Sequence, residues 1–279
     1  MIKRFSIDQL VRRNGGRYLI IVFAMTQILA LLGAIPGILS IRVNAEFDET
    51  QLRIFSFAVP VLIIITNLIL LAIGWRLTPI ARKRLDSWAK ESTKAGSEDE
   101  LLAWIEITSL NWRYGIAAAF VVFFVDILPI FLISFSREEV ISSAFQPTAL
   151  NSSDPIYILI GGAVSLFGSV ILAMLLIERF TLPIRVILLP RDFETQLKGR
   201  SGLLLNGKFL TLTLALIVIA ILLIVPIGYQ HTVRVLYSEI SSLEIFRGLQ
   251  LQSVLFSVLA LLLGAGFSYF VAKAVSDPA

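Results

Sequence analysis

Apolar residues along the chain gather in six long runs separated by polar segments. The runs cover about 17–41, 53–75, 113–135, 156–178, 208–230 and 251–272. At about 1.5 Å of rise per residue, a helix over any of these runs crosses about 30 Å of hydrocarbon. Charged residues are nearly absent from the runs. The pattern predicts an all-α integral membrane protein with six transmembrane helices over 17–272, preceded by a tail over 1–16.

The composition agrees with this prediction and narrows the chemistry. The chain is 57% apolar, has no cysteine and has a single histidine, His231, whereas a soluble domain would be about 45–50% apolar. A disulfide framework, a thiolate metal site and a His-based cluster are therefore excluded. Walker A, GxGxxG, HExxH and GxSxG sequences do not occur. The sequence predicts no catalytic residue, no metal and no cofactor in this segment.

The basic residues are distributed unequally between the two sides of the predicted membrane domain. Most of the 24 Lys and Arg residues fall in 1–17, 76–113 and 179–208, with Lys273 after the last run. The opposing loops, 42–52, 136–155 and 231–250, hold few. The basic side is expected to be cytoplasmic, which puts both termini inside a bacterial inner membrane. Because topology explains the net charge of +4, no nucleic-acid partner is predicted.

Three sets of marks recur along the chain. Before each odd-numbered run stands an Asn followed by a base and an aromatic ring, at 14–18, 111–114 and 206–209. Within each odd run lies a proline: Pro36, Pro129 and Pro226. After each even run a base precedes a hydroxyl and a proline, at 76–79, 179–183 and 273–278. The chain is interpreted as three parallel-repeat helical hairpins, an arrangement also found among transporters.

Each mark has a physical meaning in a membrane helix. A base beside an aromatic ring anchors a helix at the headgroup level. A proline inside a span kinks the helix, and a proline just past its end breaks or bends it. The alternative to a repeat is chance recurrence, because anchors and prolines are common in membrane helices.

One acidic side chain, Asp126, lies well inside a predicted span. Placing a carboxylate there costs about 2.5–3.5 kcal/mol on insertion scales. One interpretation is a proton, ion or ligand site, with Gln27 or Asn67 nearby. The other is a neutral or hydrogen-bonded carboxyl near Pro129 that helps to hold the helices together.

Small residues mark the faces where helices are expected to approach closely. The fourth run carries Gly161, Ser165 and Gly168. The sixth run carries a seam of Ser253, Ser257, Ala260 and Gly264. Their helical spacing puts each set on one face. The seam of the sixth run packs either within the bundle or across a dimer axis.

The inner segment 76–112 predicts a short helix of its own. Ser97 followed by Glu100 forms a possible capping box ahead of an apolar stretch. The resulting amphipathic helix either lies on the membrane surface or serves as a solvated connector.

The end of the chain resembles the junction between a last transmembrane helix and a HAMP linker. Such linkers open with a helix exit, a polar turn and a proline, here Lys273, Ser276, Asp277 and Pro278. The second inner loop, 182–190, also resembles the corresponding part of proteins that carry such a linker. Together with six predicted spans and two cytoplasmic termini, these features resemble the membrane module of bacterial HAMP-containing class III adenylate/guanylate cyclases. The linker over 273–279 is interpreted as truncated, so the chain is expected to be a fragment.

The resemblance implies a sensory module that regulates a cytosolic output domain beyond Ala279, acting as a homodimer. None of that family's catalytic residues occurs here, so whether the parent chain is an enzyme stays open. With small outer loops, the expected partners are the bilayer and either a lipophilic ligand or another membrane protein. The alternatives are a histidine-kinase sensor, a transporter or permease using Asp126, and half of an ABC-type exporter. Exporters of that type have much longer cytoplasmic helix extensions.

Overall fold

The computed structural model describes most of the first four predicted spans and parts of the last two. The described residues are 7–45, 47, 49–90, 97–135, 154–189, 213, 216–224, 250, 253–255, 257–262, 264–266 and 268. Every element within them is helical. Four of these helices are long and apolar enough to cross a membrane, over Gln9–Asn44, Leu52–Arg76, Leu110–Leu132 and Pro155–Ile187. The protein is therefore an all-α, multi-pass membrane protein.

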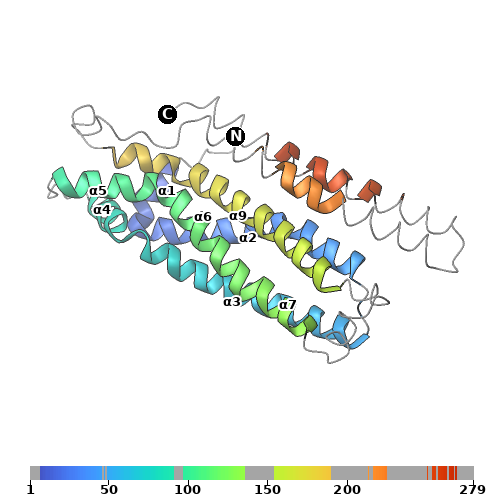
Figure 1. The fold of residues 1–279 in the computed structure, drawn as a ribbon. Helices are drawn as coiled ribbons and strands as arrows, with labels where there is room; N and C mark the ends of the chain where they lie inside the picture. The colour runs from blue at the N-terminus through green and yellow to red at the C-terminus, as the bar shows by residue number, and fades with distance from the viewer. Residues whose placement is uncertain are drawn as a thin grey trace, which may run out of the picture.

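The helices follow one another with short connections. They are α1 (Ile7–Asn14), η1 (Gly15–Arg17), α2 (Tyr18–Asn44), α3 (Glu49–Arg76), α4 (Pro79–Ala89), α5 (Ser97–Thr108), α6 (Leu110–Val121), η2 (Val122–Ile127), α7 (Leu128–Phe135) and α9 (Asp154–Ile187). The long helices α2, α3, α6 with η2 and α7, and α9 run lengthwise beside one another, while α1, α4 and α5 gather at one end (Figure 1).

The last two predicted spans are described only in part. Residues 216–224 are helical, and a shorter apolar helix covers Ser253–Gly266. Pro226 and the linker over 273–279 lie outside the described residues. Six spans and a threefold hairpin repeat therefore stay predictions.

The closest helix pair is formed by α2 and α9, which touch along their backbones. A methyl group added at Gly33 would collide with the carbonyl oxygen of Gly168, and one at Gly37 would collide with that of Gly161. The Ser165 hydroxyl donates to the Ala34 carbonyl at 2.9 Å. The small residues predicted to mark a close approach on the fourth run are confirmed, and their partner is α2.

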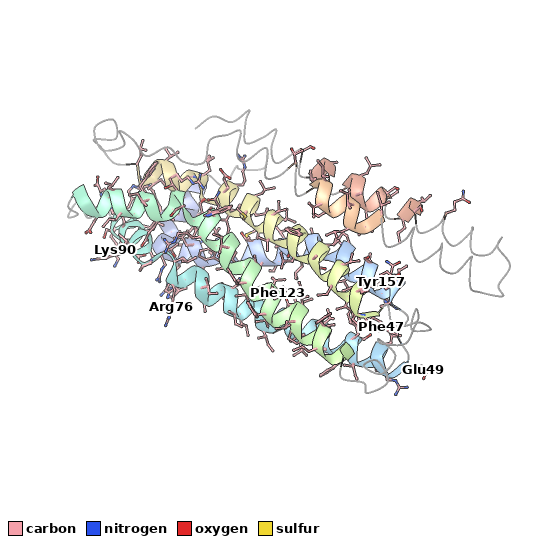
Figure 2. All side chains as sticks on the ribbon, in the orientation of Figure 1. Phe47, Glu49, Arg76, Lys90, Phe123 and Tyr157 are labelled. Atoms are coloured by element: carbon pink, nitrogen blue, oxygen red, sulfur yellow. The ribbon has the colours of Figure 1, made fainter. Side chains whose placement is uncertain are left out.

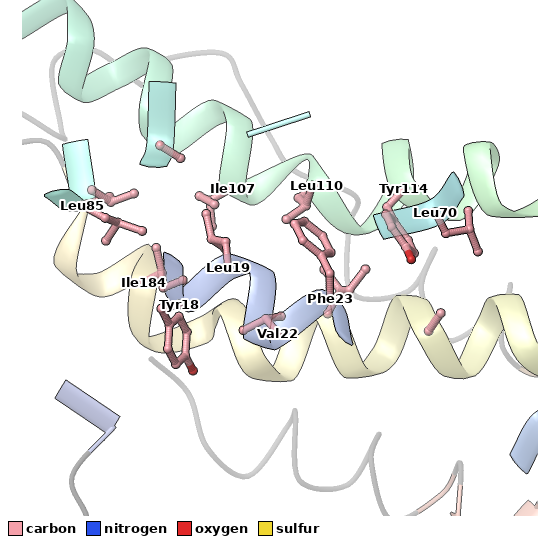
Figure 3. Close-up of a cluster of buried hydrophobic side chains, with 14 of the residues drawn as sticks. Tyr18, Leu19, Val22, Phe23, Leu70, Leu85, Ile107, Leu110, Tyr114 and Ile184 are labelled. Atoms are coloured by element: carbon pink, nitrogen blue, oxygen red, sulfur yellow. The ribbon is translucent and has the colours of Figure 1, made fainter. Parts of the chain in front are cut away.

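The helices α1, η1, α4 and α5 form a folded layer at one end of the bundle, here called the helical cap. Val11, Leu85 and Ile107, one from each α-helix, are fully buried and belong to one cluster with Ile184 of α9. Figure 3 shows this cluster continuing into the bundle. The short helix predicted after Ser97 is thus confirmed as α5. It is not a solvated connector, because Ala103 and Ile107 on its apolar face are buried in the cap; contact with the membrane surface stays a prediction.

Polar contacts fix the cap to the bundle. The Gly16 amide donates to Asp86 Oδ1 at 2.8 Å, where the chain turns at Gly15 with a φ of 51°. A side chain at Gly15 would have to occupy the position of this carboxylate. Glu106 of α5 accepts the Ala81 amide of α4 at 2.8 Å, which satisfies an amide of the first helical turn. An ion pair joins Arg84 to Glu100.

One of the sequence interpretations needs correction in this part of the chain. Tyr18 and Tyr114 do not anchor helices at the headgroup level, because they are only 7% and 0% exposed and lie inside the bundle. The prolines after the even runs also behave differently from one another. Pro79 begins α4 after α3 has ended, whereas α9 continues through Pro183 to Ile187.

Candidate functional site: a cavity inside the bundle

A cavity of about 100 Å³ lies between α2, α3, α6 with η2, and α9. On α2 its lining runs from Gln27 to Ile41, which corresponds to about 21 Å of helix. Most of the lining is apolar. Leu31, at the edge of α2, is 36% exposed, so the lining reaches the outer surface of the bundle.

Asp126 lies at the cavity on a π-helical segment, η2. Such segments are rare and frequently occur at functional sites, because the extra residue in the turn redirects the side chains. The Thr66 hydroxyl of α3 donates to Asp126 Oδ1 at 2.7 Å. The described residues that line the cavity include no Lys, Arg or His. The carboxyl group therefore has a hydroxyl partner but no base beside it in the cavity lining.

A second polar pair lies toward the helical cap. Gln27 Nε2 donates to the Tyr114 hydroxyl oxygen at 3.1 Å, and the Tyr114 ring stacks on Phe23 with 5.5 Å between centroids. Twelve residues separate Tyr114 from Asp126, which corresponds to about 18 Å of helix. Asn67 Nδ2 donates to the Ile63 carbonyl of its own helix at 2.7 Å.

The structure brings the three predicted polar residues, Asp126, Gln27 and Asn67, to one cavity. The sequence interpretation missed Thr66, the direct partner of Asp126, and assigned Tyr114 to an anchor. A signal for Thr66 was available, because Thr66 and Asn67 form a polar pair inside a strongly apolar run.

The predicted kink prolines that the structure describes, Pro36 and Pro129, are not among the residues that line the cavity. Pro36 is buried within α2, and Pro129 follows η2 in α7. A further proline, Pro60, lies inside α3, so prolines within the described spans are not confined to odd runs. Pro226 and the exit residues Lys273, Ser276, Asp277 and Pro278 lie outside the described residues.

The predicted seam of the sixth run is open where it is described. Ser253 and Ser257 are exposed, whereas Ala260 and Gly264 are half-buried. A methyl group added at Gly264 would meet no atom within 4 Å. The choice between packing in the bundle and packing across a dimer axis stays a prediction.

A separate polar cluster joins α6 to α9 near the cap. Asn111 Nδ2 donates to Glu178 Oε2 at 3.3 Å, and Arg185 Nη1 lies 3.7 Å from Glu178 Oε1. The Tyr18 hydroxyl donates to the Phe180 carbonyl at 3.2 Å. These contacts hold α2, α6 and α9 together at the end where the cap packs.

A scan against protein-family models, a search of curated proteins and a search of solved structures each found no match. The class of protein is therefore defined only by its fold and its cavity: it is an all-α, multi-pass membrane protein with a cavity between its helices.

Proposed function

We propose that the chain is a membrane-embedded sensory module, in which occupancy of the cavity changes the packing of the last two spans and thereby regulates a cytosolic output domain. The observation that carries the proposal is the position of α9. Gly162 and Ser165 of α9 line the cavity. Val164, which lies between them in the sequence, is fully buried against Ile219 and Leu223.

The contact continues from there toward the sixth run. Leu259 packs against the cluster formed by Val164, Ile219 and Leu223. A packed series of side chains thus extends from the cavity wall to the helix that precedes the HAMP-like exit. Coupling between distant sites requires such an element with two arrangements, and a difference of a few kcal/mol between them is enough.

The finer parts of the proposal follow from the sequence. The end of the bundle that carries the cap is cytoplasmic, both termini are inside, and the location is a bacterial inner membrane. The output domain is a HAMP-linked adenylate/guanylate cyclase reached through Lys273 to Pro278, and the chain works as a homodimer. A histidine kinase is the alternative output.

The test is a fusion of residues 1–279, joined at Ala279, to a HAMP linker and a class III cyclase domain. Cyclic-nucleotide production in bacterial membranes is compared with that of the same output domain on an unrelated membrane anchor. We expect basal output to differ between the two fusions. Equal output, with equal response to added lipid extracts, contradicts the proposal.

Transport is the second candidate function, and the position of Asp126 in the cavity favours it. Ionisable side chains that face a cavity inside the membrane often mark the pathway of a substrate, an ion or a proton in transporters. In proteoliposomes, Asp126→Asn would then abolish substrate flux while leaving the fold intact.

A further inference from the structure

We propose that the cavity binds a protonated lipophilic amine, with its ammonium group at Asp126 and its hydrocarbon part along the apolar lining. The inference rests on the proposed function only in taking the cavity as the ligand site. It concerns the chemistry of the ligand, which the donors, acceptors and charges of the lining define.

The polar groups of the lining have largely used their hydrogen-bond donors within the protein. The hydroxyls of Thr66, Ser165 and Ser169 donate to Asp126, Ala34 and Leu166 respectively. Both side-chain amides also donate to protein oxygens, Gln27 to Tyr114 and Asn67 to Ile63.

The polar lining residues therefore retain mainly hydrogen-bond acceptors. Both carboxyl oxygens of Asp126 have capacity for further bonds, and each amide keeps its carbonyl oxygen. The donors left over are the Tyr114 hydroxyl hydrogen and the second hydrogen of each amide. The strongest acceptor is the carboxylate, and a ligand that complements it must carry a donor.

The negative charge of the Asp126 carboxylate favours a ligand that donates from an ammonium group over one that donates from a hydroxyl. A carboxylate in an apolar surrounding is unfavourable unless it is paired and hydrogen-bonded, and the described lining residues include no Lys, Arg or His. An alkylamine is protonated at neutral pH, as the Lys side chain is. Its ammonium supplies both the missing positive charge and up to three donors, so the pair can be charge-assisted.

The shape of the cavity determines which hydrocarbon group the ligand can carry. The cavity is narrow, at about 100 Å³, yet its lining follows α2 from Gln27 to Ile41. Cavities of about 150 Å³ hold one benzene ring, so only the ammonium group and the first few carbons of a slender alkyl chain fit inside, and the rest of the chain follows the open lining toward the bilayer. The bilayer supplies the route of entry, because the lining reaches the outer surface of the bundle at Leu31.

The experiment uses residues 1–279 in lipid nanodiscs and a pair of photoreactive probes. The probes are octylamine and octanol, each carrying a diazirine at the same chain position, and labelled peptides are identified by mass spectrometry. We expect the amine to label α3 and η2 at least about tenfold more than the alcohol, as a charge-assisted hydrogen bond predicts. Excess unlabelled octylamine should remove this labelling.

Three variants assign the effect to the carboxyl group. Asp126→Asn should reduce amine labelling to the level of the alcohol, and Asp126→Glu should retain the preference for the amine. Glu49→Gln is the matched control, because it removes a charge from an exposed side chain outside the cavity. Circular dichroism in the same nanodiscs checks that each variant is folded.

Equal labelling by the two probes in the wild-type protein overturns the proposal, whether or not the variants fold. Undiminished amine labelling of folded Asp126→Asn overturns it as well. Since labelling is measured without an output domain, either result leaves signal transmission untouched. Specific labelling by an amine that leaves the output of the cyclase fusion unchanged would count against the sensory function instead.

Discussion

Glu106 shows how one side chain joins two helices of the cap. Its carboxylate accepts the Ala81 amide in the first turn of α4, whereas the side chain of the N-cap residue Thr78 makes no capping hydrogen bond and donates back to the Gly74 carbonyl. Burial raises the pKa of Glu106, and the amides of Ala81 and Ile80 and the nearby arginines lower it by less. The half-buried carboxyl is therefore easier to protonate than a carboxyl in water.

The sign of the pH dependence follows from this raised pKa. A group whose pKa is higher in the folded state contributes its stability below the unfolded pKa, about 4.3 for Glu. That contribution is lost as the pH rises through the folded pKa. We expect the free energy of unfolding of the wild type, relative to Glu106→Gln, to fall as the pH rises from the unfolded pKa through the higher folded pKa of Glu106. Thermal unfolding followed by circular dichroism measures it, and a difference that grows with pH would contradict the assignment.

The residue scale also shows where sequence reasoning stops. Asp126 is conspicuous in the sequence because a carboxylate in an apolar run is costly. Thr66 is visible in the sequence as half of a polar pair with Asn67, but its pairing with Asp126 is not, because that pairing depends on how α3 is rotated and on the π-helical turn of η2. A π turn adds one residue and changes which side chains face the cavity. The spacing of apolar residues in the sequence does not reveal such a turn.

At the element scale, the helices themselves were predictable and their pairing was not. Runs of apolar residues specify the extents of α2 and α3 to within four residues, because the bilayer demands a minimum length, whereas α9 continues nine residues past the predicted end of its run. The hairpin interpretation draws attention to neighbours in the sequence. The tightest contact instead joins α2 to α9, since steric fit between small residues, and not apolarity, selects partners in lipid.

The contact between α2 and α9 yields a prediction with a control inside the chain. Gly37→Ala places a methyl group against the Gly161 carbonyl oxygen, and we expect a loss of about 1–3 kcal/mol from overpacking. Gly266→Ala meets no atom within 4 Å, so it should be neutral or slightly stabilising through helix propensity. Thermal unfolding in detergent micelles compares the two. Equal midpoints would mean that the crossing is not close.

On the scale of the whole molecule, the distribution of basic residues predicts orientation. Figure 2 shows Arg76 and Lys90 at the end that carries the cap, and Phe47, Glu49 and Tyr157 at the opposite end. The positive-inside rule predicts that the first end is cytoplasmic. Because the chain has no cysteine, single cysteines can be introduced without background.

Labelling of whole cells with a membrane-impermeant maleimide tests this orientation. Glu49→Cys should be labelled in intact cells, and Lys90→Cys only after the membrane is permeabilised. Both side chains are exposed, so access to the reagent depends on the side of the membrane. The reverse pattern would invert the topology and place the predicted linker outside the cell.

The central claim is that the state of the cavity reaches the sixth run through α9, and the output of the cyclase fusion tests it most directly. The measurement compares Asp126→Asn in two backgrounds, wild type and Val164→Ala. We predict that Asp126→Asn changes cyclic-nucleotide output at least about threefold in the wild-type background, within the range of known coupling energies. Its effect should largely disappear in the Val164→Ala background, because the two positions then no longer act on one another. An output that Asp126→Asn leaves unchanged, or changes equally in both backgrounds, would contradict the account.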